Sequence, residues 1–296
     1  YVERCLTSMQ NFRDVWTGIT TLGHRHFRSY YLSATAVSAY RPYDVDVAMN
    51  ARALLPGLWA AWYSRNPALL HLLEDWGQAW IADASRAANG KPAGVIPSAV
   101  AFDGDRIGGH GAHWYDPELT YTYYNWDHLG HVNELQYMLT GLYALTQKQL
   151  FLQTVNFNAA LMQKPLLQKD SATPGSLPWV QQQLRSGGLD HAAGVNPMGK
   201  LFAMAKQLSG SSRYDTLLGK YGAAYNRYTL YHNKQLLEQG LQQMLDGVRY
   251  NFPLLTTEAK FTDRVYIPDN TLLGGMSLGH FGAGYEYPSR LEIGRA

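Results

Sequence analysis

The chain has 296 residues, of which 46% are hydrophobic and only 16% charged, and its 25 basic and 23 acidic side chains leave a net charge of +2. This near-neutral balance, without runs of Lys or Arg, argues against nucleic acid as the main partner. No window approaches the ~18 consecutive apolar residues of a membrane-spanning helix, so we expect no membrane partner either. The single cysteine, Cys5, excludes an intrachain disulfide framework and a multi-cysteine zinc site.

The two ends of the sequence predict a processed or truncated chain. The first residues, Tyr1 to Cys5, contain neither an initiator methionine nor a signal-peptide pattern. The last fifteen, 282–296, stop just after an aromatic stretch (Tyr285, Tyr287) that resembles the start of a strand. We therefore expect further sequence beyond this end.

Helical spacing of apolar residues dominates the first third of the chain. It predicts a helix over 44–64, with Asp44 or Asp46 as its N-cap. A second helix is predicted over 68–88, because Pro67 is tolerated in a first helical turn and Asn89-Gly90 is a stop signal.

A long glycine- and proline-rich passage follows over 92–125 and carries several tryptophans and tyrosines. Connections longer than about 12–15 residues are usually functional or disordered. Because this one is rich in aromatic residues, we expect an ordered, functional loop.

Helical periodicity then returns, and the predicted helices are 128–146, 148–162, 196–208, 212–226 and 231–248. Residues 171–188 are polar and turn-rich, and the chain becomes β-like after 251. Helix pairs recur roughly every 40–50 residues, a period typical of repeat architectures. The predicted fold class is therefore all-α dominated: an incomplete (α/α) toroid of helical hairpins over 1–250, with a β-like segment over 251–296 that would enter a truncated β-sandwich domain.

The segment 108–134 is the richest in chemistry-bearing side chains. Trp and Tyr rings offer flat apolar faces with a polar edge, which suits the faces and hydroxyls of a sugar, and polar groups in a cleft mark a binding site. The expected substrate-binding residues are His113, Trp114, Tyr115, Tyr123, Tyr124, Trp126, His128, His131 and Glu134. The alternative is that these aromatics pack the loop onto the helix ends.

No metal is predicted at this segment. His128 and His131 are three residues apart and Glu134 follows three further on, which differs from the spacing that zinc peptidases use. We accordingly predict no metal and no cofactor.

Two later segments also carry candidate groups. His191 lies in a glycine-rich turn, where its pKa of about 6.5 would allow acid or base catalysis, although a surface or capping role explains it equally well. Tyr228 belongs to a run of tyrosines at helical spacing, which is more typical of a core. Arg264 follows Asp263, and an arginine so held could bind a carboxylate, although a structural ion pair would look the same.

Several enzyme classes are disfavoured by missing motifs. The sequence lacks a phosphate-binding GxxxxGK[ST] loop, a dinucleotide-binding fingerprint and a Gly-x-Ser-x-Gly elbow. Phosphoryl transfer, hydride transfer and serine esterase chemistry are therefore not expected.

The sequence resembles the α/α-toroid polysaccharide lyases that act on uronic-acid polymers such as alginate or glucuronan. Four stretches carry this resemblance: NPALLHLLEDWGQAW, GKPAGVIPSAV, YTYYNWDHLGHVNELQYMLTGLYALT and FTDRVYIP. The resemblance is diffuse and spans most of the chain. It implies a working set of Asn, His, Tyr and Arg, matched here by Asn133, His191, Arg264 and one tyrosine. The candidate tyrosines are Tyr228, Tyr231, Tyr250 and Tyr266.

The resemblance implies β-elimination without a cofactor on an acidic polysaccharide, and hence a secreted or periplasmic location. Asn133 and Arg264 would neutralise the uronate carboxylate as the enolate-like charge forms, and His191 and a tyrosine would move the protons. One alternative is a glycoside hydrolase that uses two carboxylates among Asp116, Asp127, Glu134 and Asp190. Another is a carbohydrate-binding protein without activity. The sequence does not determine the oligomeric state.

Overall fold

The computed structural model describes residues 2–41, 43–116, 129–187 and 196–251. In these residues the protein is dominated by helices with two small sheets, so the predicted all-α-dominated class is confirmed. The chain divides into two compact units, residues 1–189 with 201–214 and residues 190–200 with 215–296. Each unit is described by itself.

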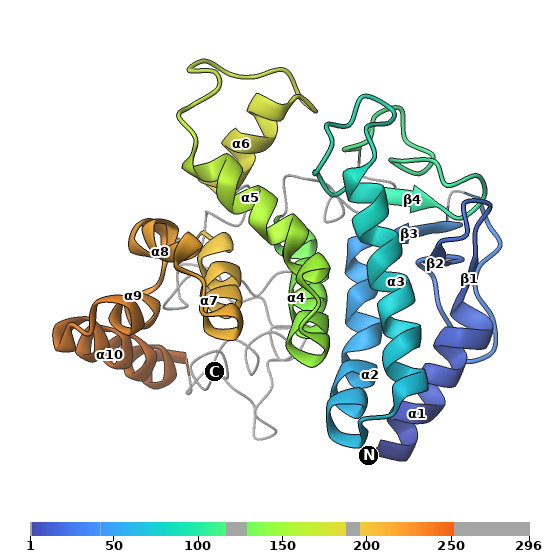
Figure 1. Ribbon diagram of the computed structural model, residues 1–296, viewed down its shortest axis with the longest axis horizontal. Coiled ribbons are helices and arrows are strands. Elements are labelled where there is room, and N and C mark those ends of the chain that lie inside the picture. The colour runs from blue at the N-terminus through green and yellow to red at the C-terminus, as the bar shows by residue number, and fades with distance from the viewer. Residues whose placement is uncertain (1, 42, 117–128, 188–195, 252–296) are drawn as a thin grey trace. The chain divides into compact units, whose positions relative to one another are not determined.

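The elements of the first unit are short strands set between longer helices (Figure 1). The helices are α1 (Val2–Asn11), α2 (Ala51–Ser64), α3 (Pro67–Ser85), α4 (Leu129–Thr146), α5 (Gln153–Gln163) and α6 (Leu177–Ser186). The strands are β1 (Thr17–Ile19), β2 (Arg25–Phe27), β3 (Val45–Val47) and β4 (Ala99–Ala101). A π-helical turn (Phe12–Trp16) and 3₁₀ turns (Ala48–Asn50, Gln149–Leu152, Ser212–Tyr214) connect them.

Helices α2 and α3 form the central hairpin of this unit, with α1 packed beside α2 (Figure 1). Arg65 ends α2 in the left-handed region at φ 56°, and the Asn66 side chain then accepts hydrogen bonds from two amides of the first turn of α3. Pro67 starts α3 because the N–H that it lacks would be unpaired there. The predicted helix–helix boundary is therefore confirmed.

Close approach of α1 and α2 depends on Gly57. A Cβ at this position would lie 2.1 Å from the sulfur of Met9, which is far inside van der Waals contact. Met9 and Cys5 are the buried residues of α1. The glycine thus lets the first helix bury its apolar side against α2.

The sheets join segments distant in sequence. β1 pairs with β2 in a hairpin, and β3 pairs antiparallel with β4 so that Val45 faces Ala101 and Val47 faces Ala99. All four of these side chains are buried in one cluster. The prediction of a helix from residue 44 is therefore wrong: residues 45–47 form a strand, and α2 begins only at Ala51.

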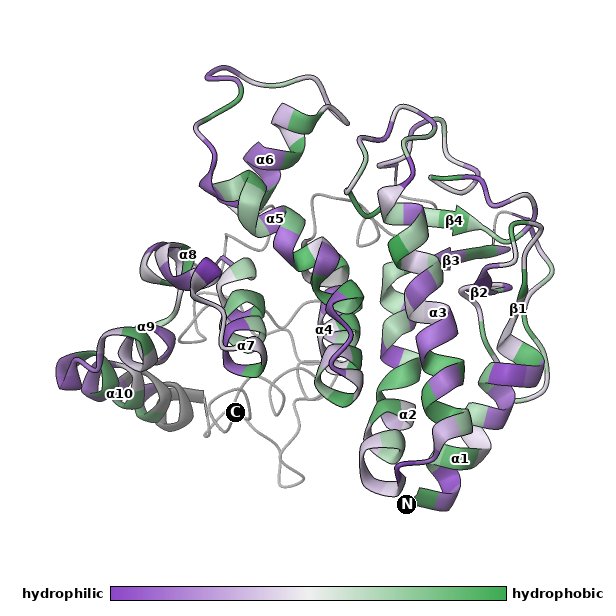
Figure 2. Ribbon diagram, viewed as in Figure 1, coloured by the Kyte–Doolittle hydropathy of each residue, from purple (hydrophilic) through white to green (hydrophobic). Residues whose placement is uncertain are grey.

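The apolar faces predicted for α3 and α4 form the core. Leu73, Trp76 and Trp80 of α3 are fully buried, as are Leu135, Leu139 and Leu142 of α4. α2 packs against both helices, and Figure 2 shows that apolar residues predominate along it.

The helix α6 was not predicted, although its local signals are present in the turn-rich stretch 171–188. The Ser176 side chain accepts a hydrogen bond from Trp179 N, Pro178 stands in the first turn, and Gly187 ends the helix at φ 83°. Short polar helices with strong caps are missed when apolar periodicity is the main signal.

In its described residues the second unit contains the helices α8 (Asp215–Tyr221), α9 (Ala224–Tyr231) and α10 (Lys234–Asn251), of which α9 and α10 pack as a hairpin. α7 (Met198–Ser209) contains the boundary between the units. Across the described ranges the helices form hairpins but no closed ring, so the toroid stays a prediction. The predicted β-like segment 251–296 lies outside the described residues from 252 onward. None of the helices described here combines the length and apolar character needed to cross a bilayer.

Candidate functional site

Many of the residues predicted for the site lie outside the described ranges. They are Tyr123, Tyr124, Trp126, Asp127, His128, Asp190, His191, Arg264 and Tyr266. The backbone of His131 belongs to α4, but its side chain is not described. The roles predicted for these residues stay predictions.

The described part of the aromatic segment is mixed in character. Trp114 is only 1% exposed, and its Nε1–H donates to the carbonyl of Gly175 at 3.1 Å. Its ring is covered by protein, so it offers no face to a sugar here, contrary to its predicted role. His113 is exposed, stacks on Tyr115 with ring centres 5.1 Å apart, and pairs with Asp116 at 3.2 Å. This pair remains open to solvent.

Asn133, the predicted carboxylate-binding amide, is buried in α4 with 1% exposure. Neither atom of its amide group has a hydrogen-bond partner within the described part of the chain, and the same is true of Gln136 one turn later. Unpaired buried amides are rare and call for an explanation. Glu134, by contrast, is partly exposed and forms an ion pair with Arg52.

Tyr228 lies in the second unit and is half-buried. Its ring contacts Tyr225 and His232, with centres 6.2 and 6.3 Å away. These contacts fit the packing interpretation of the tyrosine run.

A group of tyrosines that the sequence analysis did not single out gathers in the first unit. We call Tyr30, Tyr31, Tyr40 and Tyr43 the tyrosine surface. Tyr31 and Tyr43 stack with their planes 17° apart and centres 5.7 Å apart, while Tyr30 and Tyr40 each meet Tyr43 edge-on at 5.0 Å. Tyr31 is 61% and Tyr40 64% exposed, so aromatic faces are presented to solvent.

Backbone hydrogen bonds hold this group in place. Tyr43 N donates to Tyr40 O at 2.6 Å and closes a turn, and Tyr30 N donates to Tyr43 O at 3.1 Å. Asp44 directly follows the turn and immediately precedes β3. The strand pairing with β4 therefore anchors one end of the tyrosine surface to the core.

A histidine–aspartate pair lies beside this turn. His110 Nε2 is 2.6 Å from Asp44 Oδ1, and Arg41 Nε donates to His110 Nδ1 at 3.4 Å. Because a guanidinium can only donate, Nδ1 accepts and Nε2 carries the proton given to Asp44. The side chains of His110 and Asp44 are 15% and 25% exposed, so solvent reaches them. We call Arg41, Asp44 and His110 the His110 group.

The loop that carries His110 is shaped by glycine. Gly108 has φ +82°, and a Cβ there would lie 2.5 Å from the Cα of Trp114. This close approach folds the loop back on itself. Arg106, which is exposed, closes it by donating to the carbonyl of Gly111 at 2.8 Å, so a second guanidinium binds the residue that follows His110.

The tyrosine surface, the His110 group and Arg106 together could bind an acidic sugar and remove a proton from it. Exposed aromatic faces suit the C–H faces of a sugar ring, and two exposed arginines suit a carboxylate, which guanidinium groups bind in a fork. A histidine oriented by a carboxylate can accept a proton near neutral pH. The combination fits an acidic sugar better than a neutral one.

A second aromatic surface, on α2, has no charged residue in its lining, unlike the tyrosine surface with its neighbouring arginines. Trp59, Trp62 and Tyr63 of α2 are exposed and, with Val2, Cys5 and Ala60, line an open groove of about 360 Å³. None of these six lining residues carries a charge. The groove therefore lacks the cation that an acidic sugar requires.

Below the surface, Asp46 organises a buried polar network. Its Oδ2 accepts hydrogen bonds from His26 Nδ1 at 2.9 Å, Trp76 Nε1 at 2.9 Å and Trp80 Nε1 at 3.0 Å. Asn50 donates to Oδ1 at 2.9 Å. Asp46 was predicted as a helix N-cap together with Asp44, and both predictions are wrong, because these carboxylates bind side chains distant in sequence instead.

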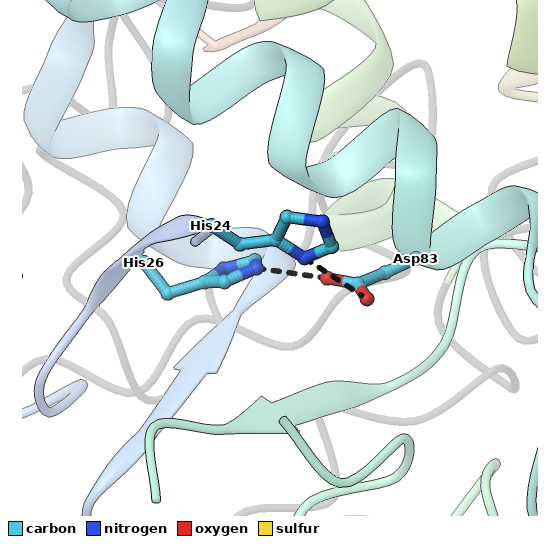
Figure 3. A group of neighbouring side chains, drawn as sticks. All are labelled: His24, His26 and Asp83. Atoms are coloured by element: carbon cyan, nitrogen blue, oxygen red, sulfur yellow. Dashed lines mark hydrogen bonds and ion pairs between the residues drawn. The ribbon is translucent and has the colours of Figure 1, made fainter. Parts of the chain in front are cut away.

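His26 occupies the centre of this network, with its other nitrogen, Nε2, 2.8 Å from Asp83 Oδ2. Burial disfavours the charged imidazole, but the hydrogen bonds to Asp46 and Asp83 outweigh this and raise the pKa of His26 from 6.5 to about 9. Figure 3 shows His24 and His26 both directed at the carboxylate of Asp83. Donor atoms of these three residues lie within 4.8 Å of one another.

Some of these residues could have been found from sequence. His24 and His26 are separated by one residue, and such a pair in a strand points to one side. The dense tyrosines of 30–43 are visible as well. Asp83 and Asp105 had no comparable signal, because their positions depend on how α3 and the loop after β4 pack.

Comparison with models of known protein families, with curated proteins and with solved structures finds no match to this chain.

Proposed function

We propose that this protein is a lyase that cleaves a uronic-acid-containing polysaccharide by β-elimination, and that the reaction takes place at the His110 group beside the tyrosine surface. The observation that carries the proposal is the exposed Tyr31, stacked on the half-buried Tyr43, next to a histidine–aspartate pair and two exposed arginines. The helical hairpins of both units support an (α/α) toroid as the larger architecture.

The difficult step in this reaction is removal of the C5 proton, which lies α to a carboxylate. Arg41 would bind that carboxylate and stabilise the negative charge as it grows. Binding would also draw the Arg41 Nε–H away from His110 Nδ1, where its hydrogen bond is already long at 3.4 Å.

His110 would then act as the base. Its Nε2–H stays bound to Asp44, which orients the ring and stabilises the imidazolium, and Nδ1 takes the C5 proton. The electron pair forms the C4–C5 double bond and the C4–O bond breaks. A tyrosine of the tyrosine surface would protonate the departing oxygen, so that one chain gains an unsaturated end and the other a hydroxyl.

This assignment moves the base from His191 to His110 and leaves Asn133 a supporting role at most. The 1% exposure of Asn133 argues against direct contact between its amide and a polymer. The acidic-polysaccharide substrate and the secreted or periplasmic location remain part of the proposal, since a polymer must be met outside the cytosol.

Incubation with alginate, glucuronan and glycosaminoglycans tests the proposal directly. Elimination creates a conjugated double bond, so ultraviolet absorbance should rise with the natural protein on at least one polymer. Reducing sugars without that absorbance would identify a hydrolase. Binding to these polymers without any products would identify a carbohydrate-binding protein, and either outcome would overturn the lyase proposal.

A further inference from the structure

A second site lies inside the first unit, separate from the tyrosine surface, where histidines and carboxylates from four segments meet. His24 precedes β2, His26 lies in β2, Asp83 is on α3, and Asp105 follows β4. Figure 3 shows three of these side chains converging. Metal sites in proteins combine this kind of ligand set from separate elements.

Two of the three distances within the group are close to those between ligands of one metal ion. His26 Nε2 lies 2.8 Å from Asp83 Oδ2, and His24 Nδ1 lies 3.6 Å from Asp83 Oδ1 and 3.9 Å from Asp105 Oδ1. Ligand atoms of a tetrahedral zinc site are about 3.4 Å apart, because bonds of about 2.0–2.1 Å meet at tetrahedral angles. The 3.6 and 3.9 Å distances are near this value, whereas the 2.8 Å distance is a hydrogen bond that a bound ion would lengthen.

Within the described ranges, two of the atoms directed into this space lack a hydrogen bond and have only long ion-pair contacts, and they lie 3.9 Å from each other. Asp105 Oδ1 and His24 Nδ1 are buried and have no hydrogen bond within the part of the chain that the structure describes. The Asp105 side chain is fully buried. Its other oxygen, Oδ2, is held by Thr21 Oγ1 at 2.9 Å and Leu22 N at 3.0 Å. A buried carboxylate oxygen without a hydrogen bond costs free energy in a protein interior, and a metal ion bound to it would reduce that cost.

The surrounding contacts also resemble those of a metal site. Histidine ligands usually donate their second N–H to a carboxylate, which fixes the ring and its tautomer. His26 Nδ1 donates a hydrogen bond to Asp46, and Trp76 and Trp80 donate to the same carboxylate. The second ring nitrogen, Nε2, therefore points toward Asp83 and could bind a metal ion.

One feature could compete with a cation. Arg86 Nη2 donates to Asp83 Oδ1 at 2.6 Å and to the carbonyl of Asp105 at 2.7 Å. Asp46, Asp83 and Asp105 nevertheless supply three carboxylates, which Arg86 and the His26 imidazolium offset only in part, and a bound metal ion would replace the proton on His26 Nε2. Asp83 Oδ2 remains directed at His26.

We infer that His24, His26 and Asp83 form a binding site for a divalent transition metal ion of the zinc class, which Asp105, 3.9 Å from His24 Nδ1, would complete as the fourth ligand. Four protein ligands leave no open position, which is typical of a structural site. Two imidazoles favour zinc over calcium or magnesium, which prefer oxygen ligands alone. The ion would tie the β1–β2 hairpin to α3 and to the loop after β4.

The test is zinc titration of the whole chain after dialysis against a chelator, followed by calorimetry and thermal unfolding. The natural protein should bind one Zn²⁺ per chain and unfold at a higher temperature with zinc, while Ca²⁺ should have no effect. His24→Ala and Asp105→Asn should each weaken zinc binding at least tenfold. His24 is partly exposed, so its variant should still fold, which circular dichroism checks.

His71→Ala is the matched control, since His71 is an exposed histidine on α3 and should not affect zinc binding. Absence of stoichiometric zinc binding by the natural protein would overturn the inference, leaving only a buried ion-pair network. Undiminished binding by both site variants, or an equal response to Ca²⁺, would do so as well.

Discussion

Asp44 Oδ1 lies 2.6 Å from His110 Nε2 although 66 residues separate them. Asp44 immediately precedes strand β3, and His110 lies in the loop after β4, so the pairing of these two strands brings the two residues together. A carboxylate in this position fixes the histidine tautomer and stabilises its charged form.

Asp44→Asn should therefore reduce the turnover number much more than substrate affinity. Asparagine keeps the size of the side chain but cannot stabilise the imidazolium, and we expect turnover to fall at least about tenfold, which is less than the full contribution of a general base, roughly 10²–10⁴-fold. Steady-state kinetics on the polymer that gives the best absorbance signal measure this. A change confined to KM would show that Asp44 does not act through the base.

Tyr31→Ala should weaken polymer binding with little effect on folding. The ring is 61% exposed and stacks on Tyr43, so its loss removes one aromatic face, a contribution of about 1 kcal/mol or fivefold in Kd. Tyr63→Ala is the control, because Tyr63 is exposed on α2 away from any predicted sugar contact. Equal weakening in both variants would argue against a specific tyrosine surface.

Asp46→Asn should destabilise the first unit strongly. The change removes the charge that accepts from His26 and from two tryptophan N–H groups, and breaking a buried pair costs about 3–5 kcal/mol. Urea unfolding measures the free energy. Asp14→Asn removes a carboxylate from a solvent-exposed pair with Arg13 and should change stability little, and a similar effect of both substitutions would contradict the role given to Asp46.

Lys91 provides a prediction about pH. Its buried ammonium donates to the carbonyls of Ala84, Pro92 and Val95, and burial lowers the pKa of Lys91 from 10.5 to about 8. Between these values the folded protein has released a proton that the unfolded chain still holds. The Lys91 contribution to the unfolding free energy should therefore rise with pH over this interval.

Comparison with Lys91→Met isolates this contribution, because the other titrating groups are common to both proteins. The variant should be less stable throughout, since three carbonyls lose their donor, each loss costing about 1–3 kcal/mol. The stability difference between the two proteins should grow from pH 8 to pH 10. A difference that stays constant or shrinks would show that the Lys91 pKa is not lowered.

The sequence predicted those parts of the fold that depend on local signals. The Asn66-Pro67 boundary, the apolar faces of α3 and α4 and the helical class follow from caps and periodicity. Residues 45–47 were assigned to a helix because their apolar spacing continues that of α2. Only pairing with 99–101, more than fifty residues away, makes them a strand, and no local pattern contains that information.

The candidate site was less predictable for the same reason. Trp114 was expected to face a sugar from its residue type, but packing against Tyr115 and Trp179 covers it. Asp44, Asp46 and Asp83 look alike in sequence, as carboxylates at or within predicted helices. Their pairing with His110, for Asp44, and with His26, for Asp46 and Asp83, is set by tertiary contacts, whereas the Asp83–Arg86 pair is local.

The most direct test of the proposed reaction is the mass of its products in ¹⁸O-labelled water. Digestion of a uronic-acid polymer by the natural protein should give fragments with an unsaturated end, one water lighter than hydrolysis products and free of label. His110→Ala should give none of them while still binding the polymer. Labelled, saturated fragments, or unsaturated fragments formed equally by the His110 variant, would contradict elimination at this histidine.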